Sequence, residues 1–194
     1  MADISDGDVN PKGVLKHLGD IEQRLRAPQG TLSALVQESD WSLLIKLHVL
    51  IEGAVSTLLA TQLDQRLLDV FSRHSLGGRT GKLAFARSLD LLTPRELSFV
   101  EALTELRNKA AHGVSSMGFN IASYFDSIDS IQRNAFFERL LMAQASIDSR
   151  AMWRSLFDGS PRGTMIVATV LFLMNTDLKC QQLNLGMPIT HLTL

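Results

Sequence analysis

The chain has little cysteine and little net charge, and each shortage excludes a class of protein. Its 194 residues contain one cysteine and carry a formal net charge of -1. Cys180 alone cannot form a disulfide within the chain, which favours a cytoplasmic protein in which this side chain is a small buried hydrophobe. A near-neutral chain also argues against general, high-affinity binding of duplex nucleic acid, because such binding relies on neutralising phosphates.

Long hydrophobic runs and a leader sequence are also missing. The longest strongly apolar run, Met165 to Met174, contains ten residues and is broken only by Thr169. It is too short to cross a bilayer, so we expect a buried helix and no membrane association. Residues 1–10 contain three aspartates and no basic residue. This composition predicts a disordered acidic tail and no secretory signal.

Alternating strand patterns and internal repeats are almost absent, and helical periodicity dominates the chain. We therefore expect one all-α domain over residues 11–185, an up-and-down helical bundle with a long terminal helix, followed by a C-terminal tail over 186–194. A loop with one helical turn at most is expected over residues 114–130. Shorter helices are predicted over residues 11–26, 31–38, 64–74, 80–91, 130–145 and 146–157, and the long terminal helix over 161–183.

Two helices have the clearest signals. The first is predicted to begin at Asp40 as its N-cap and to run to about Leu63. Its core face is formed by apolar residues at helical spacing: Leu43, Leu44, Leu47, Ile51, Ala54, Val55 and Leu58. The second begins at Thr93-Pro94-Arg95-Glu96, a capping box with proline at the first helical position, and Gly113 is expected to end it. Its inward residues are predicted to be Phe99, Ala102, Leu103, Leu106 and Ala110.

The end of that second helix carries the main candidate site. Arg107, Asn108 and His112 fall within six residues, which places a fixed cation beside a group that titrates near neutrality. Asn108 and His112 share a helix face, whereas Arg107 and His112 are separated by about 140°. They can converge through the long arginine side chain, through unwinding near Gly113, or across two copies in a dimer. Ordinary helix-ending chemistry is the alternative, because basic residues there bond free carbonyls.

The spacing Arg-x4-His resembles the motif of the HEPN superfamily of all-helical domains, which includes ribonucleases, toxins and non-catalytic relatives. The run from Gly81 to Thr93, followed by Leu-Arg-Asn-Lys-Ala-Ala-His-Gly, is similar to HEPN proteins of the mannitol operon repressor (MltR) type. A Lys-containing helix, a Leu-Thr turn and an Arg-Asn-x-x-Ala-His-Gly ending occur there in the same order. The resemblance covers about residues 41–113.

The resemblance implies a homodimer whose composite site contains Arg107, Asn108 and His112 as catalytic residues. It implies a metal-independent endoribonuclease, or an RNA- or nucleotide-binding domain, that uses no cofactor. Two points leave the alternative open. Val114 stands where some HEPN toxins have a tyrosine that a partner modifies, and the repressor-type relatives are regulators rather than demonstrated nucleases. The alternative is therefore a non-catalytic regulatory or scaffold protein that acts through a protein partner.

Four further residues are candidate supports of this site. His48 and Glu52 lie four apart on one helix face, so Glu52 can orient Arg107 or His112; an ordinary surface pair is the alternative. The pair is not expected to bind metal, because no third ligand stands at usable spacing. Lys82 and Lys109 belong to a region, residues 79–109, with six basic and four acidic residues. This excess suits one phosphate-bearing ligand, and a solvated face of mixed charge is the alternative.

Overall fold

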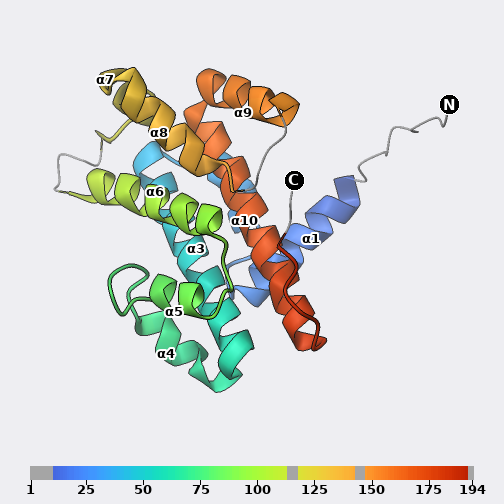
Figure 1. The fold of residues 1–194 in the computed structure, drawn as a ribbon. Coiled ribbons are helices and arrows are strands. Elements are labelled where there is room, and N and C mark those ends of the chain that lie inside the picture. The colour runs from blue at the N-terminus through green and yellow to red at the C-terminus, as the bar shows by residue number, and fades with distance from the viewer. Residues whose placement is uncertain (1–10, 113–117, 143–146, 192–194) are drawn as a thin grey trace.

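The computed structural model describes residues 11–112, 118–142 and 147–191, and these contain helices and no strand. This confirms the all-α helical bundle (Figure 1). The expected tail over residues 1–10 lies outside the described residues. The helices are α1 (Pro11–Arg24), α2 (Thr31–Ala34), η1 (Leu35–Gln37), α3 (Asp40–Leu63), η2 (Gln65–Leu67), α4 (Leu68–Arg73), α5 (Lys82–Ser88), α6 (Pro94–Ala111), α7 (Ile121–Ser127), α8 (Ser130–Leu140), α9 (Ile147–Gly159) and α10 (Pro161–Asn184).

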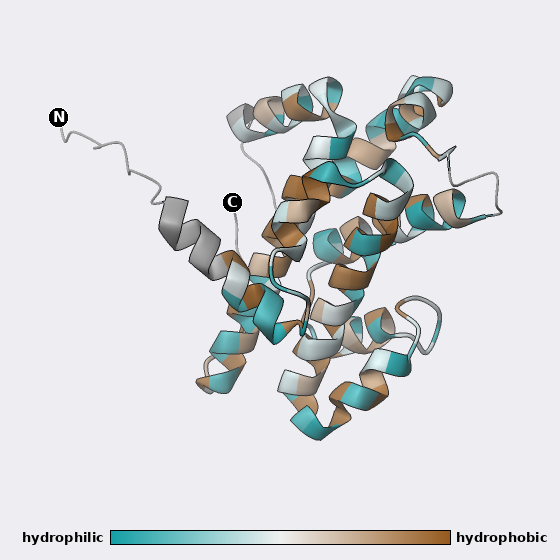
Figure 2. Cartoon of the chain, turned by 180° about the vertical axis from the view of Figure 1, so that it is seen from behind, coloured by the Kyte–Doolittle hydropathy of each residue, from teal (hydrophilic) through white to brown (hydrophobic). Residues whose placement is uncertain are grey.

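Helices α3 and α10 pack against each other and form the centre of the bundle (Figure 1). The outer helices pack on them: α4, α5 and α6 on α3, and α7 and α9 on α10, with α8 covering α6. All seven apolar residues predicted for the core face of α3 are buried, as are the five predicted for α6. Hydrophobic segments are frequent along the two central helices in Figure 2. The central helices therefore provide most of the buried apolar surface that stabilises the fold.

By length and composition alone, α3 and α10 are each apolar enough to cross a membrane. Within the bundle, 67% of the apolar stretch of α3 and 56% of that of α10 is buried. Helices in the core of a globular domain meet the same criterion, because they are buried on most sides and are therefore apolar on most sides. The apolar run Met165 to Met174 was expected to form a buried helix, and the packing of α10 on α3 confirms this.

The predicted capping box at the start of α6 is confirmed. The Thr93 hydroxyl accepts a hydrogen bond from the Glu96 backbone N–H at 3.1 Å, and the Glu96 carboxylate accepts one from the Thr93 N–H at 2.6 Å. Pro94 occupies the first turn, where its missing N–H has no intrahelical partner to lose. This reciprocal cap fixes the start of α6, and the buried Leu106 and Ala110 fix the rotation of its last turns. Together they determine where the polar residues near position 107 point.

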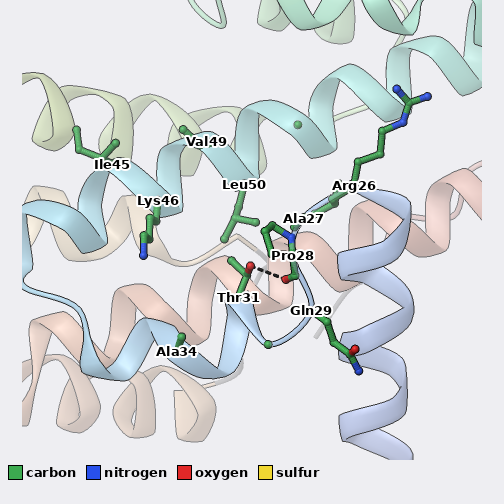
Figure 3. Close-up of a pocket in the computed structure, with 13 residues that line it drawn as sticks. Arg26, Ala27, Pro28, Gln29, Thr31, Ala34, Ile45, Lys46, Val49 and Leu50 are labelled. Carbon is green, nitrogen blue, oxygen red and sulfur yellow. Dashed lines mark hydrogen bonds between the residues drawn. The ribbon is translucent and has the colours of Figure 1, made fainter.

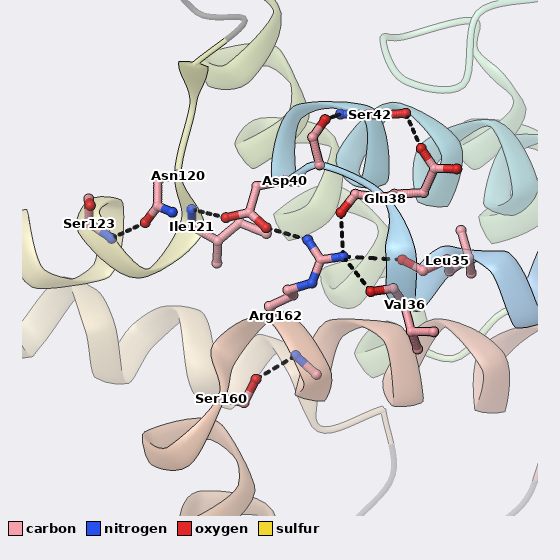
Figure 4. Close-up of polar contacts among 12 residues, drawn as sticks. Leu35, Val36, Glu38, Asp40, Ser42, Asn120, Ile121, Ser123, Ser160 and Arg162 are labelled. Atoms are coloured by element: carbon pink, nitrogen blue, oxygen red, sulfur yellow. Dashed lines mark hydrogen bonds and ion pairs between the residues drawn. The ribbon is translucent and has the colours of Figure 1, made fainter.

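The prediction that Asp40 caps α3 was wrong. Ser39 is the N-cap, and its hydroxyl accepts a hydrogen bond from the Ser42 N–H at 3.3 Å. Asp40 instead forms an ion pair with Arg162 and accepts a hydrogen bond from the Ile121 N–H at 2.8 Å (Figure 4). The Arg162 guanidinium also donates to the carbonyl oxygens of Leu35, Val36 and Glu38. The Asp40 carboxylate therefore joins the first turns of α3, α7 and α10, which are remote in sequence.

Helices α1 and α5 end earlier than predicted because a residue in the left-handed conformation follows each of them. Arg26 has φ 55° after α1, and Asp90 has φ 52° after α5. At both positions the next residue donates its N–H to a carbonyl five residues back, Ala27 to Glu22 and Leu91 to Ala86. This pattern defines a Schellman motif, in which glycine is the usual left-handed residue. Arginine and aspartate gave no sequence signal for it.

The structure also contains a helix where the sequence predicted a loop over residues 114–130. Helix α7 has two turns, and Asn120 caps it by accepting a hydrogen bond from the Ser123 N–H at 2.8 Å. Residues 113–117 lie outside the described part of the chain. The polar composition concealed the helix, because it forms only when Ile121 and Phe125 are buried against the bundle.

A cavity of about 590 Å³ lies between the turn that joins α1 to α2 and the outer face of α3 (Figure 3). The turn contributes residues 25–31, and the wall on α3 includes Ile45, Val49 and Gly53. The Thr31 hydroxyl donates a hydrogen bond to the Pro28 carbonyl at 2.6 Å, which closes the turn. The cavity therefore has a wall fixed by local hydrogen bonding on one side and a core helix on the other.

Candidate functional site

The last turns of α6 place the candidate residues at the edge of the bundle. Leu106 and Ala110 point into the core, so the residues between and after them face outward. Arg107 is half-buried, and Asn108, Lys109 and His112 are exposed. The predicted helix-terminal position of this group is therefore observed, and each side chain is placed by the rotation of α6.

Arg107 is held by two neutral side chains. Its guanidinium donates a hydrogen bond to the Asn108 side-chain oxygen at 2.9 Å. A second guanidinium nitrogen lies 3.3 Å from Nδ1 of His48, which projects from the middle of α3 and is buried. Among the described residues, no carboxylate oxygen lies within 4.0 Å of the Arg107 guanidinium. Arg107 is thus positioned without a counter-ion in direct contact.

The contact with Arg107 identifies the protonation state of His48. A guanidinium can only donate hydrogen bonds, so Nδ1 of His48 must accept and is unprotonated. Burial and the charge of Arg107 both lower the pKa of His48, with a further lowering by Lys82 and an opposing effect of Glu52. A Glu52 oxygen lies 3.9 Å from Nδ1. At neutral pH the His48 imidazole is uncharged, because its pKa lies below 6.5, so this contact is not an ion pair.

Lys82 and Glu52 form a separate ion pair, one helical turn after His48 along α3. Lys82 is the first residue of α5, and its side chain is 0% exposed. Its ammonium lies 2.8 Å from a Glu52 carboxylate oxygen and donates a hydrogen bond to the Ser56 hydroxyl at 3.1 Å. His48, Glu52 and Ser56 follow one another at four-residue spacing along α3. Polar contacts therefore extend across α6, α3 and α5, and we call Arg107, Asn108, His48, Glu52, Lys82 and Ser56 the polar network.

Several sequence predictions about the polar network need correction. Glu52 was expected to orient Arg107 or His112, but it binds Lys82, and His48 takes the position beside Arg107. The alternative, a surface pair at (i, i+4) spacing, is met in its spacing, since Nδ1 of His48 lies 3.9 Å from a Glu52 oxygen, but His48 itself is buried. Lys82 was expected to support a phosphate-bearing ligand, with a solvated face of mixed charge as the alternative, and it is instead fully buried. Sequence reasoning missed Ser56, although its place four residues after Glu52 continued the same helix face.

Lys109 and His112 lie at the end of α6 beyond the polar network. The Lys109 ammonium donates a hydrogen bond to the Tyr124 hydroxyl of α7 at 2.9 Å and lies 5.1 Å from the centre of its ring. Lys109 therefore supports the contact between α6 and α7. His112 is the C-cap residue of α6, with φ -78° and ψ 96°, and its side chain is exposed. Gly113, the expected left-handed residue, lies outside the described residues.

The structure also bears on metal binding and on Cys180. Among the described residues, no group of three histidine, cysteine or acidic side chains is arranged to hold a metal ion. Cys180 is a buried free thiol, which confirms its predicted role as a small core residue. Burial raises its pKa to about 11, against a smaller lowering by a hydrogen bond to Thr61. The thiolate is therefore scarce at neutral pH, and Cys180 is not a nucleophile there.

The environment of His48 predicts an acid-sensitive fold. Its folded pKa lies below the unfolded value of 6.5, so the unfolded chain binds more protons between these two values. The stabilisation is complete above pH 6.5 and is lost as the pH falls through that range. We expect the free energy of unfolding to fall from pH 7.5 to 5.5, by no more than about 1.4 kcal/mol per pH unit from this group.

Urea denaturation at several pH values measures this effect. His48→Gln keeps an oxygen that can accept the hydrogen bond of Arg107 but cannot titrate, so its stability should change less with pH. His74→Gln, at an exposed histidine, is the matched control and should keep the dependence of the wild type. Equal pH dependence of all three proteins would show that His48 is not the responsible group.

Comparison of the chain with protein-family models, with curated proteins and with solved structures finds no match.

Proposed function

We propose that this chain is a HEPN-like domain that binds a phosphate group of RNA or of a nucleotide through Arg107 at the end of α6. The observation that supports it is the way Arg107 is held: half-buried, fixed by Asn108 and His48, and without a carboxylate in contact among the described residues. Arg24, Arg139 and Arg162, by contrast, each have a carboxylate partner. A positioned guanidinium whose charge is not neutralised is suited to an anion, which it can bind in bidentate fashion.

The same site suits RNA cleavage without a metal. The ribose 2′-hydroxyl attacks the adjacent phosphorus, the 2′ O–P bond forms, the 5′ O–P bond breaks, and a 2′,3′-cyclic phosphate remains. One group must take the proton of the 2′-hydroxyl and another must protonate the leaving 5′ oxygen. In the homodimer that we propose, the two copies of His112 meet these needs, one as base and one as acid. Arg107 would stabilise the charge that develops on the phosphate oxygens.

Binding can be tested separately from catalysis with labelled single-stranded RNA, read by fluorescence polarisation. We expect Arg107→Ala to weaken binding by about tenfold, which corresponds to about 1.4 kcal/mol and to the loss of one charged hydrogen-bonding group. Arg87→Ala is the matched control, because Arg87 lies in the same basic region but is paired with Glu101 at 3.2 Å. Equal losses for the two variants would contradict a specific role for Arg107.

Cleavage is tested by the products formed from RNA and from the same strand with 2′-deoxyribose. We expect a cyclic phosphate product from RNA only, a rate about 10²- to 10⁴-fold lower for His112→Ala, and little change in its binding. Solution mass should show two chains per particle. Background cleavage that is equal in wild type, Arg107→Ala and His112→Ala would eliminate the enzyme, and a strict monomer would remove the composite site.

The second candidate function is the non-catalytic regulator that acts through a protein partner. It is favoured by the hydrogen bond between Arg107 and Asn108, because the two side chains hold each other in place without a ligand. The discriminating experiment is a defined protein complex compared between wild type and His112→Ala. A stable complex that survives this substitution, together with no RNA binding, would support the regulator over the RNA-binding domain.

A further inference from the structure

The cavity beside α3 has the size and the lining of a small-molecule site. Its volume of about 590 Å³ lies within the usual range for such sites, about 300–1,000 Å³. Its walls are mostly aliphatic and include Leu25, Ala27, Pro28, Ile45, Val49 and Leu50. Val49 is 59% exposed although it lies on the central helix. This surface therefore presents apolar groups that no described part of the chain covers.

Gly53 contributes to the cavity in a way that packing does not require. It lies within α3, where glycine is less favourable than any residue but proline. A Cβ added to Gly53 would meet no atom within 4 Å, so no close approach of another segment demands glycine there. What the missing side chain provides is space in the cavity wall. Glycine at position 53 therefore leaves the wall of the cavity open at this point.

The charges of the lining residues have one sign. Arg26 and Lys46 are the charged side chains among the described residues that line the cavity, and both are cationic. They lie at opposite ends of it, and the Arg26 side chain extends along α3 away from Leu50 (Figure 3). Each has a carboxylate partner that does not line the cavity: Glu38 for Lys46, and Asp69, 3.9 Å away, for Arg26. Both cationic side chains remain exposed in part, so a ligand in the cavity would meet cationic groups at the rim and apolar groups along the walls.

We propose that this cavity binds a small molecule with an aliphatic body and a single carboxylate. The aliphatic body lies between Pro28 and Leu50 and against Gly53, where apolar surface is removed from water. The carboxylate lies at the rim near Lys46, whose ammonium has three donors and can hold a second acceptor beside Glu38. The site is independent of the proposed RNA site, because its residues are distinct from those of the polar network.

Calorimetric titration of the full chain with octanoate and with octanol tests the proposal. We expect octanoate to bind the wild type, and octanol to bind about fivefold more weakly, since an exposed ion pair contributes up to about that factor. Lys46→Met should weaken octanoate by a similar factor and leave octanol unchanged. Octanol binding as tightly as octanoate, or no binding of octanoate, would overturn the proposal.

Gly53→Leu places a side chain in the cavity, and its Cβ would meet no atom of another segment within 4 Å. We expect it to weaken octanoate binding by about tenfold or more, while α3 keeps or gains stability because leucine favours the helix. Gly19→Leu is the matched control, since Gly19 is helical, has open space around its Cβ position and does not line the cavity. Thermal melts establish that both variants fold. Undiminished octanoate binding by folded Gly53→Leu would overturn the assignment to this cavity.

Discussion

Replacing Glu96 by alanine is expected to lower the free energy of unfolding by about 3–5 kcal/mol, the range for removing one partner of a buried ion pair. Glu96 is 2% exposed, and both of its carboxylate oxygens lie 2.7 Å from the ammonium of Lys179 in α10. Lys179 is fully buried, and within the described part of the chain its remaining hydrogen-bond acceptor is the Leu91 carbonyl at 3.1 Å. Burial already lowers the pKa of Lys179 against the effect of Glu96. Without the carboxylate, the ammonium would be buried with one acceptor.

Two further variants separate the ion pair from the capping box that Glu96 also completes. Thr93→Ala removes the other half of the cap, and its cost should be about 1 kcal/mol. Glu96→Gln combined with Lys179→Met keeps an amide oxygen for the Thr93 N–H and replaces the buried pair by neutral groups, so much of the loss should be recovered. Urea denaturation measures all three proteins. A loss for Glu96→Ala no larger than that for Thr93→Ala would contradict a role of the ion pair in stability.

Glu96 also illustrates which parts of the fold the sequence could predict. Its capping role involves residues three apart, and this local pattern predicted the start of α6 correctly. Its partner Lys179 lies 83 residues further along the chain, and no local pattern indicates that pairing. Periodicity likewise identified the buried faces of α3 and α6, because side chains three and four apart share a face whatever the tertiary structure. The fold class followed from these local signals.

The wrong predictions arose where tertiary contacts outweighed local preference. Asp40 has a favourable residue type for an N-cap, but its carboxylate forms a pair with Arg162 and the cap falls to Ser39. Helix α7 was missed because its polar composition is typical of a loop, and only burial of Phe125 against the bundle stabilises it. Such contacts depend on segments that meet only in the folded chain, so a single sequence gave no signal for them.

The candidate site was predicted as a set of residues but not as an arrangement. The structure brings five of the selected residues into one polar network: Arg107, Asn108, His48, Glu52 and Lys82. His112 and Lys109 were also selected, and they lie at the end of α6 beyond this network. Glu52 was expected to orient Arg107 or His112 and instead pairs with Lys82, which was not expected in the core because lysine is seldom fully buried. Because Lys82 is buried in the core, Glu52 provides its counter-charge. His48, rather than Glu52, therefore contacts Arg107.

This arrangement leads to the second large effect, which we expect for Glu52→Gln. The substitution leaves the ammonium of Lys82 fully buried beside a neutral amide and the Ser56 hydroxyl, with no counter-charge. We expect a loss of about 3 kcal/mol, the lower end of the range for a broken buried pair, because the Glu52 side chain is itself 28% exposed and water can reach it. Denaturation in urea at pH 7.5 measures the loss. Glu52→Gln combined with Lys82→Met removes both charges and should recover most of it.

The same substitution should change the titration of His48. Glu52 raises the pKa of His48, against the lowering by burial, Arg107 and Lys82. Removing its charge therefore moves the pKa further below 6.5, and the pH range in which the fold loses stability keeps its upper limit at 6.5 and extends further downward. The proton chemical shifts of the His48 ring, followed by NMR from pH 7.5 to 4.5, report this directly. A pKa of His48 that rises or stays constant in Glu52→Gln would show that Glu52 does not act on the imidazole. The polar network would then be interrupted between Glu52 and His48.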